Sequence, residues 1–164
     1  MSEDFKLRRS RYDHPDAVAL TEQAQQFYIE LYGGPDGTPF TADEFAPPRG
    51  GFLIGYLDDR PVAMGGWRFS PVLAPEGAER PGEIKRMFVH ESVRGRGLAR
   101  FQDHPVRTGG PRIVLQSLQQ PPGQPQVAAV GLYRAGGYAD IAPFGFYADK
   151  PTVVSLGRRL RRKR

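Results

Sequence analysis

The chain of 164 residues contains no cysteine, and this absence excludes several kinds of chemistry. Disulfide bridges, zinc sites built from thiolates and cysteine nucleophiles all need a residue that the sequence lacks. The sequence also has no apolar run of about 18 residues and no apolar segment typical of a secretory signal. We therefore expect an unexported, cytoplasmic protein with no membrane partner, long enough to fold around one core.

Basic residues outnumber acidic ones, and the formal net charge is +5 at pH 7. The excess lies at the end of the chain, in six residues: Arg158, Arg159, Arg161, Arg162, Lys163 and Arg164. Subtracting these six charges from +5 leaves the rest of the chain at −1. We therefore expect one domain over 1–157 and a basic tail over 158–164. A basic tail can bind nucleic acid, but no aromatic residue interleaves with this one for base stacking, so the pattern favours a solvated terminus.

The apolar pattern predicts a mixed α/β domain without internal repeats. Strands are expected at 5–12, 51–57, 62–69, 83–89, 112–116, 141–147 and 152–160. One helix is expected to begin near 13–16 and end at 33–35, and another to end at 136–137. The order strand, loop, helix, strand over 83–116 predicts two parallel neighbouring strands. The result is a central mixed sheet of six to seven strands flanked by helices.

A loop at 33–50 is rich in glycine and proline and carries three acidic residues, Asp36, Asp43 and Glu44. Long loops in compact domains are often binding loops, so this one could face a cationic amine. The alternative is a solvated connection.

Residues 83–89 alternate as a strand does, and two sets of side chains are expected on opposite faces: Ile84, Arg86 and Phe88 against Lys85, Met87 and Val89. The glycine-rich loop Arg94-Gly95-Arg96-Gly97-Leu98-Ala99 follows and opens a helix. Such a junction directs several backbone N–H groups and the positive end of a helix dipole at one place. The segment therefore predicts a phosphate-binding loop.

Two common phosphate loops do not fit this segment. No Lys-Ser/Thr pair follows the glycines, as a nucleotide triphosphate loop requires, and Arg100 stands where a dinucleotide loop has its third glycine. The pattern Arg94-x-x-Gly97-x-Ala99 after a strand instead resembles the acetyl-CoA pyrophosphate loop of the GNAT (Gcn5-related) N-acetyltransferases. A second segment, 132–138 (Leu-Tyr-Arg-Ala-Gly-Gly-Tyr), resembles the fourth helix of the same family.

The resemblance implies a GNAT-like acyl-CoA N-acyltransferase fold, acetyl-CoA as co-substrate and no metal. The backbone of Met87, Phe88 and Val89 would bind the pantetheine arm in a gap between two strands, and N–H groups of 94–99 would bind the pyrophosphate. The acceptor would be an amine of a small molecule or peptide. Members of this family often dimerise, so a homodimer is one expected assembly.

Two catalytic residues follow from the resemblance. Tyr133 stands where the family places a proton donor for the departing thiolate, and the alternative is a core aromatic with a satisfied hydroxyl. Glu83 begins the strand where some members place a general base, and the alternative is a salt bridge at an exposed strand end. Lys85 and Arg86 are expected to face solvent, and His90 to be a loop residue.

The helix after Ala99 departs from the family pattern, because Pro105 and Gly109-Gly110-Pro111 end it early. The segment 116–126 is correspondingly long and proline-rich. A true short helix, or a local frameshift between 101 and 126, would give this pattern. A non-catalytic acyl-CoA-binding module with the same fold also stays open as an alternative function.

Overall fold

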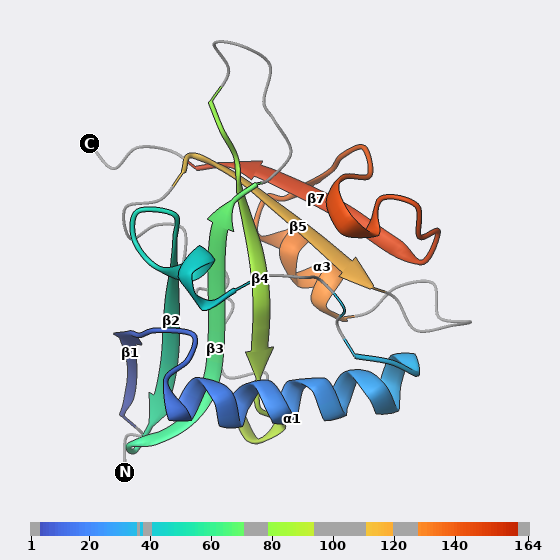
Figure 1. Ribbon diagram of the computed structural model, residues 1–164. Coiled ribbons are helices and arrows are strands. Elements are labelled where there is room, and N and C mark those ends of the chain that lie inside the picture. Colours follow the sequence, from blue (N-terminus) through green and yellow to red (C-terminus); the bar gives the residue numbers. More distant parts are fainter. Residues whose placement is uncertain are drawn as a thin grey trace.

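The computed structural model describes residues 4–35, 37, 41–70, 79–93, 111–119 and 128–160. In these residues one sheet has the strand order β1-β2-β3-β4-β5-β7-β6 (Figure 1). Its strands are β1 (Phe5–Arg9), β2 (Gly50–Leu57), β3 (Arg60–Phe69), β4 (Gly82–Val89), β5 (Ile113–Gln119), β6 (Ala139–Asp140) and β7 (Val153–Arg159). β4 and β5 are parallel, and the other neighbours are antiparallel. The predicted mixed sheet and its parallel pair are confirmed.

Among the described residues, one helix packs on each face of the sheet. α1 (Pro15–Tyr32) crosses in front of β3 and β4 in Figure 1, and α3 (Ala128–Ala135) lies behind β5. Two apolar clusters form the main core: α1 contributes Leu20 to one, with Met64 and Phe88, and α3 contributes Tyr133 to the other. Three short 3-10 turns complete the described elements: η1 (Ala42–Phe45), η2 (Glu91–Val93) and η4 (Gly145–Tyr147). None of the helices in the described residues is long and apolar enough to cross a membrane.

The ends of α1 are set by local residues, as the sequence predicts. The ring nitrogen of His14 accepts a hydrogen bond from the backbone N–H of Asp16 at 3.1 Å, and Pro15 occupies the first turn. At the other end Gly33 has φ of 80° and donates its N–H to the carbonyl of Ile29. His14 is therefore a helix cap.

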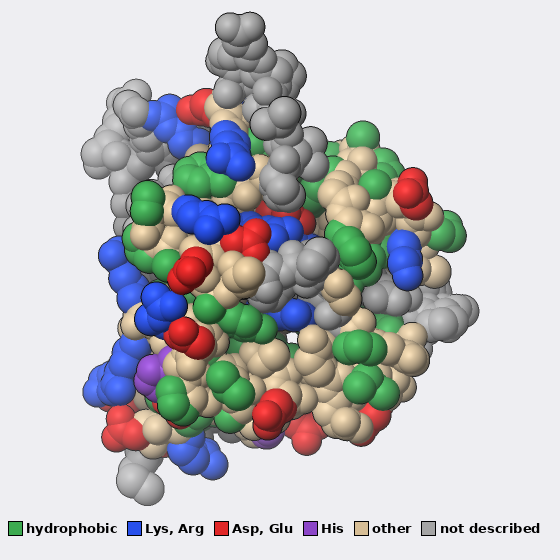
Figure 2. Space-filling model, in the orientation of Figure 1, with side chains coloured by type: hydrophobic (Ala, Val, Ile, Leu, Met, Phe, Trp, Pro, Cys, Tyr) green, Lys and Arg blue, Asp and Glu red, His purple; other side chains and the backbone are tan. Residues whose placement is uncertain are grey.

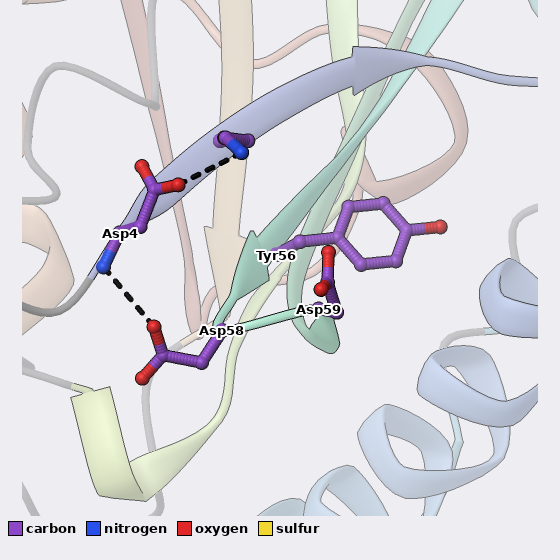
Figure 3. Close-up of a pocket in the computed structure, with 5 residues that line it drawn as sticks. Asp4, Tyr56, Asp58 and Asp59 are labelled. Carbon is purple, nitrogen blue, oxygen red and sulfur yellow. Dashed lines mark hydrogen bonds and ion pairs between the residues drawn. The ribbon is translucent and has the colours of Figure 1, made fainter.

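β2 and β3 form a hairpin next to the edge strand β1. Asp58 and Asp59 have φ of 48° and 64°, which suits the tight turn between twisted strands. This turn and Asp4 line a pocket of about 200 Å³. The Asp4 N–H donates there to the Asp58 carboxylate (Figure 3). β1 is three strands away from β4, so this pocket is remote from the parallel pair.

The predicted alternation of residues 83–89 is wrong beyond Lys85. Arg86 has φ of 55°, and the register of β3 against β4 shifts between Met64 and Gly66. This bulge adds one residue to β4 and reverses the faces that follow it. Ile84 therefore packs in the cluster of α3, whereas Phe88 packs in the cluster of α1.

The strand predicted at 141–147 is also wrong. The strand that pairs with β7 here consists of Ala139 and Asp140, and the chain then forms η4. Pro143 lacks a backbone N–H, and Gly145 has φ of 68°, which a strand does not use.

β7 (Val153–Arg159) agrees with the strand predicted at 152–160. It includes Arg158 and Arg159, which pair with Val114 and Ile113, so two arginines counted in the expected tail lie in the sheet. The glycine-rich loop of 94–99 and the helix predicted to end early at Pro105 fall outside the described residues.

Candidate active site

β4 and β5 pair over a short length and then separate. Their paired residues are Gly82 with Val114 and Glu83 with Leu115. β4 continues to Val89 and β5 to Gln119, and Figure 1 shows the two strands diverging. We call this region the fork: the space between β4 and β5 beyond Glu83. It matches the gap that the resemblance implies for a pantetheine arm.

Backbone groups of β4 point into the fork. The N–H of His90 donates to the carbonyl of Val62 at 2.7 Å, and Val89 is paired with Ala63. In an antiparallel pair of strands, the N–H and C=O groups of one residue point to the neighbouring strand and those of the next residue point away from it. The backbone groups of Val89 and Met87 therefore face away from β3.

Phe88 has the opposite phase, so its backbone faces β3. The hydroxyl of Tyr28, on α1, donates to the carbonyl oxygen of Met87 at 3.3 Å. Met87 and Val89 are therefore the two of the three expected residues whose backbone borders the fork.

Tyr133 lies at the start of the fork, on the α3 face. Its side chain is 1% exposed and packs with Ile84 and Val114. Its hydroxyl oxygen accepts a hydrogen bond from Nε2 of Gln116 at 3.3 Å. Gln116 directly follows Leu115, the last β5 residue that pairs with β4. The phenol is thus held where the strands separate.

Glu83 lies at the same level on the α1 face, because it precedes Ile84 in the strand. It belongs to a buried charge network of Glu44, Arg68, Glu83 and Lys85. Glu83 Oε1 is 2.9 Å from Lys85 Nζ, Glu83 Oε2 is 3.6 Å from Arg68 Nε, and Arg68 Nη1 is 2.9 Å from Glu44 Oε1. The two cations and two carboxylates balance, which permits their burial.

The network corrects two expectations. Lys85 does not face solvent: its side chain is 6% exposed, because its face of β4 is covered and the Glu83 carboxylate compensates its charge. Glu83 forms an ion pair, as the alternative to a base proposed, but with a side chain only 3% exposed instead of at an exposed strand end. Glu44 of the acidic loop is part of this network, while Asp43 pairs with Arg11 at 3.5 Å.

The segment at Gly37 and the turn η4 at Tyr147 contact each other over this network. The N–H of Gly37 donates to the hydroxyl of Tyr147 at 3.0 Å, and Lys85 Nζ lies 5.5 Å from the centre of the Tyr147 ring. A Cβ on Gly145 would lie 3.7 Å from Glu83 Oε1. Figure 2 shows side chains of both charges gathered on this face, above α1. These contacts cover part of the network on the side opposite Tyr133.

The remaining site predictions fall in two groups. His90 lies in a loop as predicted, with Nδ1 2.7 Å from the hydroxyl of Ser92. The phosphate-loop residues 94–99 lie outside the described residues. In the described residues no group of three or more His, Asp or Glu is arranged to hold a metal.

Sequence reasoning missed four residues of the site: Tyr28, Arg68, Lys85 and Gln116. The one local signal for Gln116 is a polar residue in the apolar run of β5.

A mixed sheet with a forked parallel pair and helices on both faces is characteristic of the acyl-CoA N-acyltransferase fold. The chain belongs to the Acetyltransferase (GNAT) family, whose model matches residues 17–101. It is 30% identical over 148 residues to an IAA acetyltransferase from Azospirillum brasilense, covering 87% of this chain and 90% of that protein. Family and fold together assign acyl transfer as the general reaction class.

Solved structures share this fold over nearly the whole chain. The GNAT domain of S. lividans PAT aligns with a TM-score of 0.65 and 16% identity, covering 96% of this chain and 97% of that one. An acetyltransferase of the GNAT family from Streptococcus pneumoniae aligns with a TM-score of 0.64 and 15% identity, covering 96% of this chain and 100% of that one. At these identities the likeness concerns the fold alone.

Proposed function

We propose that this protein is an N-acetyltransferase that moves an acetyl group from acetyl-CoA to a primary amine of a small molecule or peptide. The amine attacks the thioester directly, so no cysteine nucleophile is needed. A cytoplasmic location, expected for a chain without cysteine, belongs to the same proposal.

One observation carries the proposal: Glu83 and Tyr133 lie on opposite faces of the sheet at the level where β4 and β5 separate. A thioester held in the fork would have a carboxylate on one side and a phenol on the other. An amine could then approach from the α1 face while the thiol leaves toward α3. This is the arrangement that direct transfer between two aligned reactants requires.

Backbone groups would hold the donor. The peptide groups of Met87 and Val89 face the fork and would bind the pantetheine arm, and the N–H groups of 94–99 would bind the pyrophosphate. The N–H of Val89 would also stabilise the negative charge that develops on the thioester oxygen.

In the proposed step, the amine nitrogen forms a bond to the carbonyl carbon of the thioester, and the carbon–sulfur bond breaks. Glu83, directly or through a water, takes the proton that the ammonium must lose before it attacks, and Tyr133 gives its proton to the departing thiolate. The nitrogen loses its second proton as the amide forms, and this proton returns, through water, to the Tyr133 phenolate. The two residues thus act on opposite sides of the reacting carbon.

Thiol release from acetyl-CoA, measured across a panel of amines, tests the proposal. We expect Tyr133→Phe to lower kcat about 100-fold with little change in acetyl-CoA binding, since a general acid typically contributes about 100- to 10,000-fold. Tyr138→Phe is the matched control, because Tyr138 belongs to the same cluster and the centres of its ring and the Tyr133 ring are 5.0 Å apart. Heat of acetyl-CoA binding without turnover on any amine would instead identify a non-catalytic binding module.

A further inference from the structure

The buried ammonium of Lys85 forms a contact that the proposed reaction does not use. It lies 2.9 Å from Glu83 Oε1 and 5.5 Å from the centre of the Tyr147 ring, and its side chain is 6% exposed. Lysine is rarely buried to this extent unless its charge is compensated. Here a carboxylate and an aromatic face do so together.

These are the groups that an acceptor amine needs. A primary alkylammonium leaving water must find a carboxylate within hydrogen-bond reach, both to offset its desolvation and to take its proton. An aromatic face adds attraction for the cation and contact for the methylene next to it. Glu83 and Tyr147 therefore form a small site for an alkylammonium, which Lys85 fills.

The rest of the network keeps this site in place. Arg68 lies 3.6 Å from the other oxygen of Glu83 and is itself paired with Glu44 at 2.9 Å. Glu83 therefore has a second cation, Arg68, beside it when Lys85 moves away. Lys85 has a flexible four-carbon stem, so its ammonium can leave Glu83 without movement of β4.

We propose that Lys85 is an internal competitor of the acceptor, and that the acceptor is a primary alkylammonium on an unbranched chain, such as a lysine side chain or a diamine. The acceptor displaces the Lys85 ammonium from Glu83 and takes its place against Tyr147. This inference rests on the proposed function. It adds a substrate class and a residue that restrains binding of that substrate.

Steady-state kinetics with n-butylamine and acetyl-CoA test the competition. Lys85→Met keeps an unbranched apolar stem and removes the charge, so we expect KM for butylamine to fall about fivefold and kcat/KM to rise accordingly, which corresponds to about 1 kcal/mol of competition. Lys85→Arg keeps a cation beside Glu83 and should not show this gain. Lys150→Met, at an exposed lysine in the turn after η4, is the control for loss of a positive charge.

A purely structural role for Lys85 predicts the reverse result. The substitution would then leave a buried carboxylate less compensated, and KM for butylamine would rise or stay unchanged, which would overturn the proposal. Preference for aniline or a branched amine over butylamine would overturn the assigned substrate class.

A measurement on the unsubstituted protein covers the case in which Lys85→Met fails to fold. In an NMR spectrum of the protein with nitrogen-15-labelled lysine, the protons of a buried ammonium exchange slowly with water, so this group gives a signal of its own. Butylamine should shift or remove the Lys85 signal while leaving Lys150 unchanged; an unaffected Lys85 signal at saturating butylamine would refute displacement. Because this experiment needs neither acetyl-CoA nor turnover, its outcome is distinguishable from failure of the proposed acetyl transfer.

Discussion

The hydroxyl of Tyr28 donates a hydrogen bond to the carbonyl oxygen of Met87, with 3.3 Å between the two oxygens. Tyr28 lies on α1 and Met87 on the part of β4 beyond the bulge at Arg86. The bond therefore ties the helix to the strand segment that borders the fork. Its loss should affect the position of that segment more than the stability of the core.

Tyr28→Phe tests this connection. We expect the free energy of unfolding to change by only about 1 kcal/mol, the usual net value of one hydrogen bond, while the affinity for CoA falls several-fold. Calorimetric titration with CoA measures the second effect, and urea unfolding the first. Tyr32→Phe is the control, since Tyr32 lies one turn further along α1 with its ring 5.9 Å from that of Tyr28. Equal CoA affinity in both variants would show that the bond does not position β4.

Val89→Pro removes one backbone N–H without breaking the ladder between β3 and β4, because the peptide of Val89 faces the fork. If this N–H stabilises the developing oxyanion, kcat should fall about 100- to 1,000-fold. Val89→Ala retains the N–H and should keep most of the activity. Thiol release measures both variants, and circular dichroism checks that each is folded. Similar kcat values for the two variants would remove Val89 from this role.

Gly66 is required where β3 passes under two phenylalanines. A Cβ at this position would lie 2.8 Å from both Phe45 Cδ1 and Phe52 Cδ2. Gly66→Ala should therefore lower the free energy of unfolding by about 1 to 3 kcal/mol through overpacking. Gly131 offers the opposite case: it lies in α3, and a Cβ added there would meet no described atom within 4 Å.

Gly131→Ala should raise the free energy of unfolding by roughly 0.5 to 1 kcal/mol, because alanine is the better helix former. Urea denaturation of the two variants gives both values in one experiment. A stabilising Gly66→Ala would mean that the two rings can move aside, and the tight packing would not be what requires glycine.

Much of the fold could be predicted from local patterns. The end of α1 at Gly33 and the β2–β3 hairpin follow from residues close together in the chain, and the parallel pair follows from the order of elements over 83–116. The bulge at Arg86 could not, because a non-glycine residue with positive φ has no reliable sequence signal. The failed strand at 141–147 had aromatic and β-branched residues in a strand-like pattern, and Pro143 and Gly145 outweighed them.

The candidate site also has some residues that local motifs predict and others that depend on contacts distant in sequence. Tyr133 and Glu83 are predicted from motifs, because each lies in a short segment that resembles the family pattern, and their catalytic roles stay predictions. The burial of Lys85 depends on residues that are distant in sequence. Arg68 lies next to β4 because of the pairing register of β3 and β4, Glu44 lies in η1, and Tyr147 lies in η4. Spacing along one strand cannot show such contacts.

Tyr56 makes the free energy of unfolding depend on pH in the alkaline range. Burial, and then the 2.6 Å hydrogen bond to Asp16, raises the pKa of Tyr56 to about 12, and Figure 3 shows its hydroxyl pointing toward α1. The folded state thus holds this proton more tightly than the unfolded state, whose tyrosine has a pKa of about 10. The contribution of Tyr56 is complete below pH of about 10 and is lost as the pH rises through about 12.

Tyr56→Phe isolates this contribution from that of the other tyrosines. The difference in free energy of unfolding between the unsubstituted protein and the variant should be constant below pH of about 10. It should then shrink by up to about 2 to 3 kcal/mol toward pH of about 12. Urea unfolding at a series of pH values measures it. A difference that is independent of pH over this range would mean that Tyr56 ionises equally readily in both states, and the bond to Asp16 would not retain its proton.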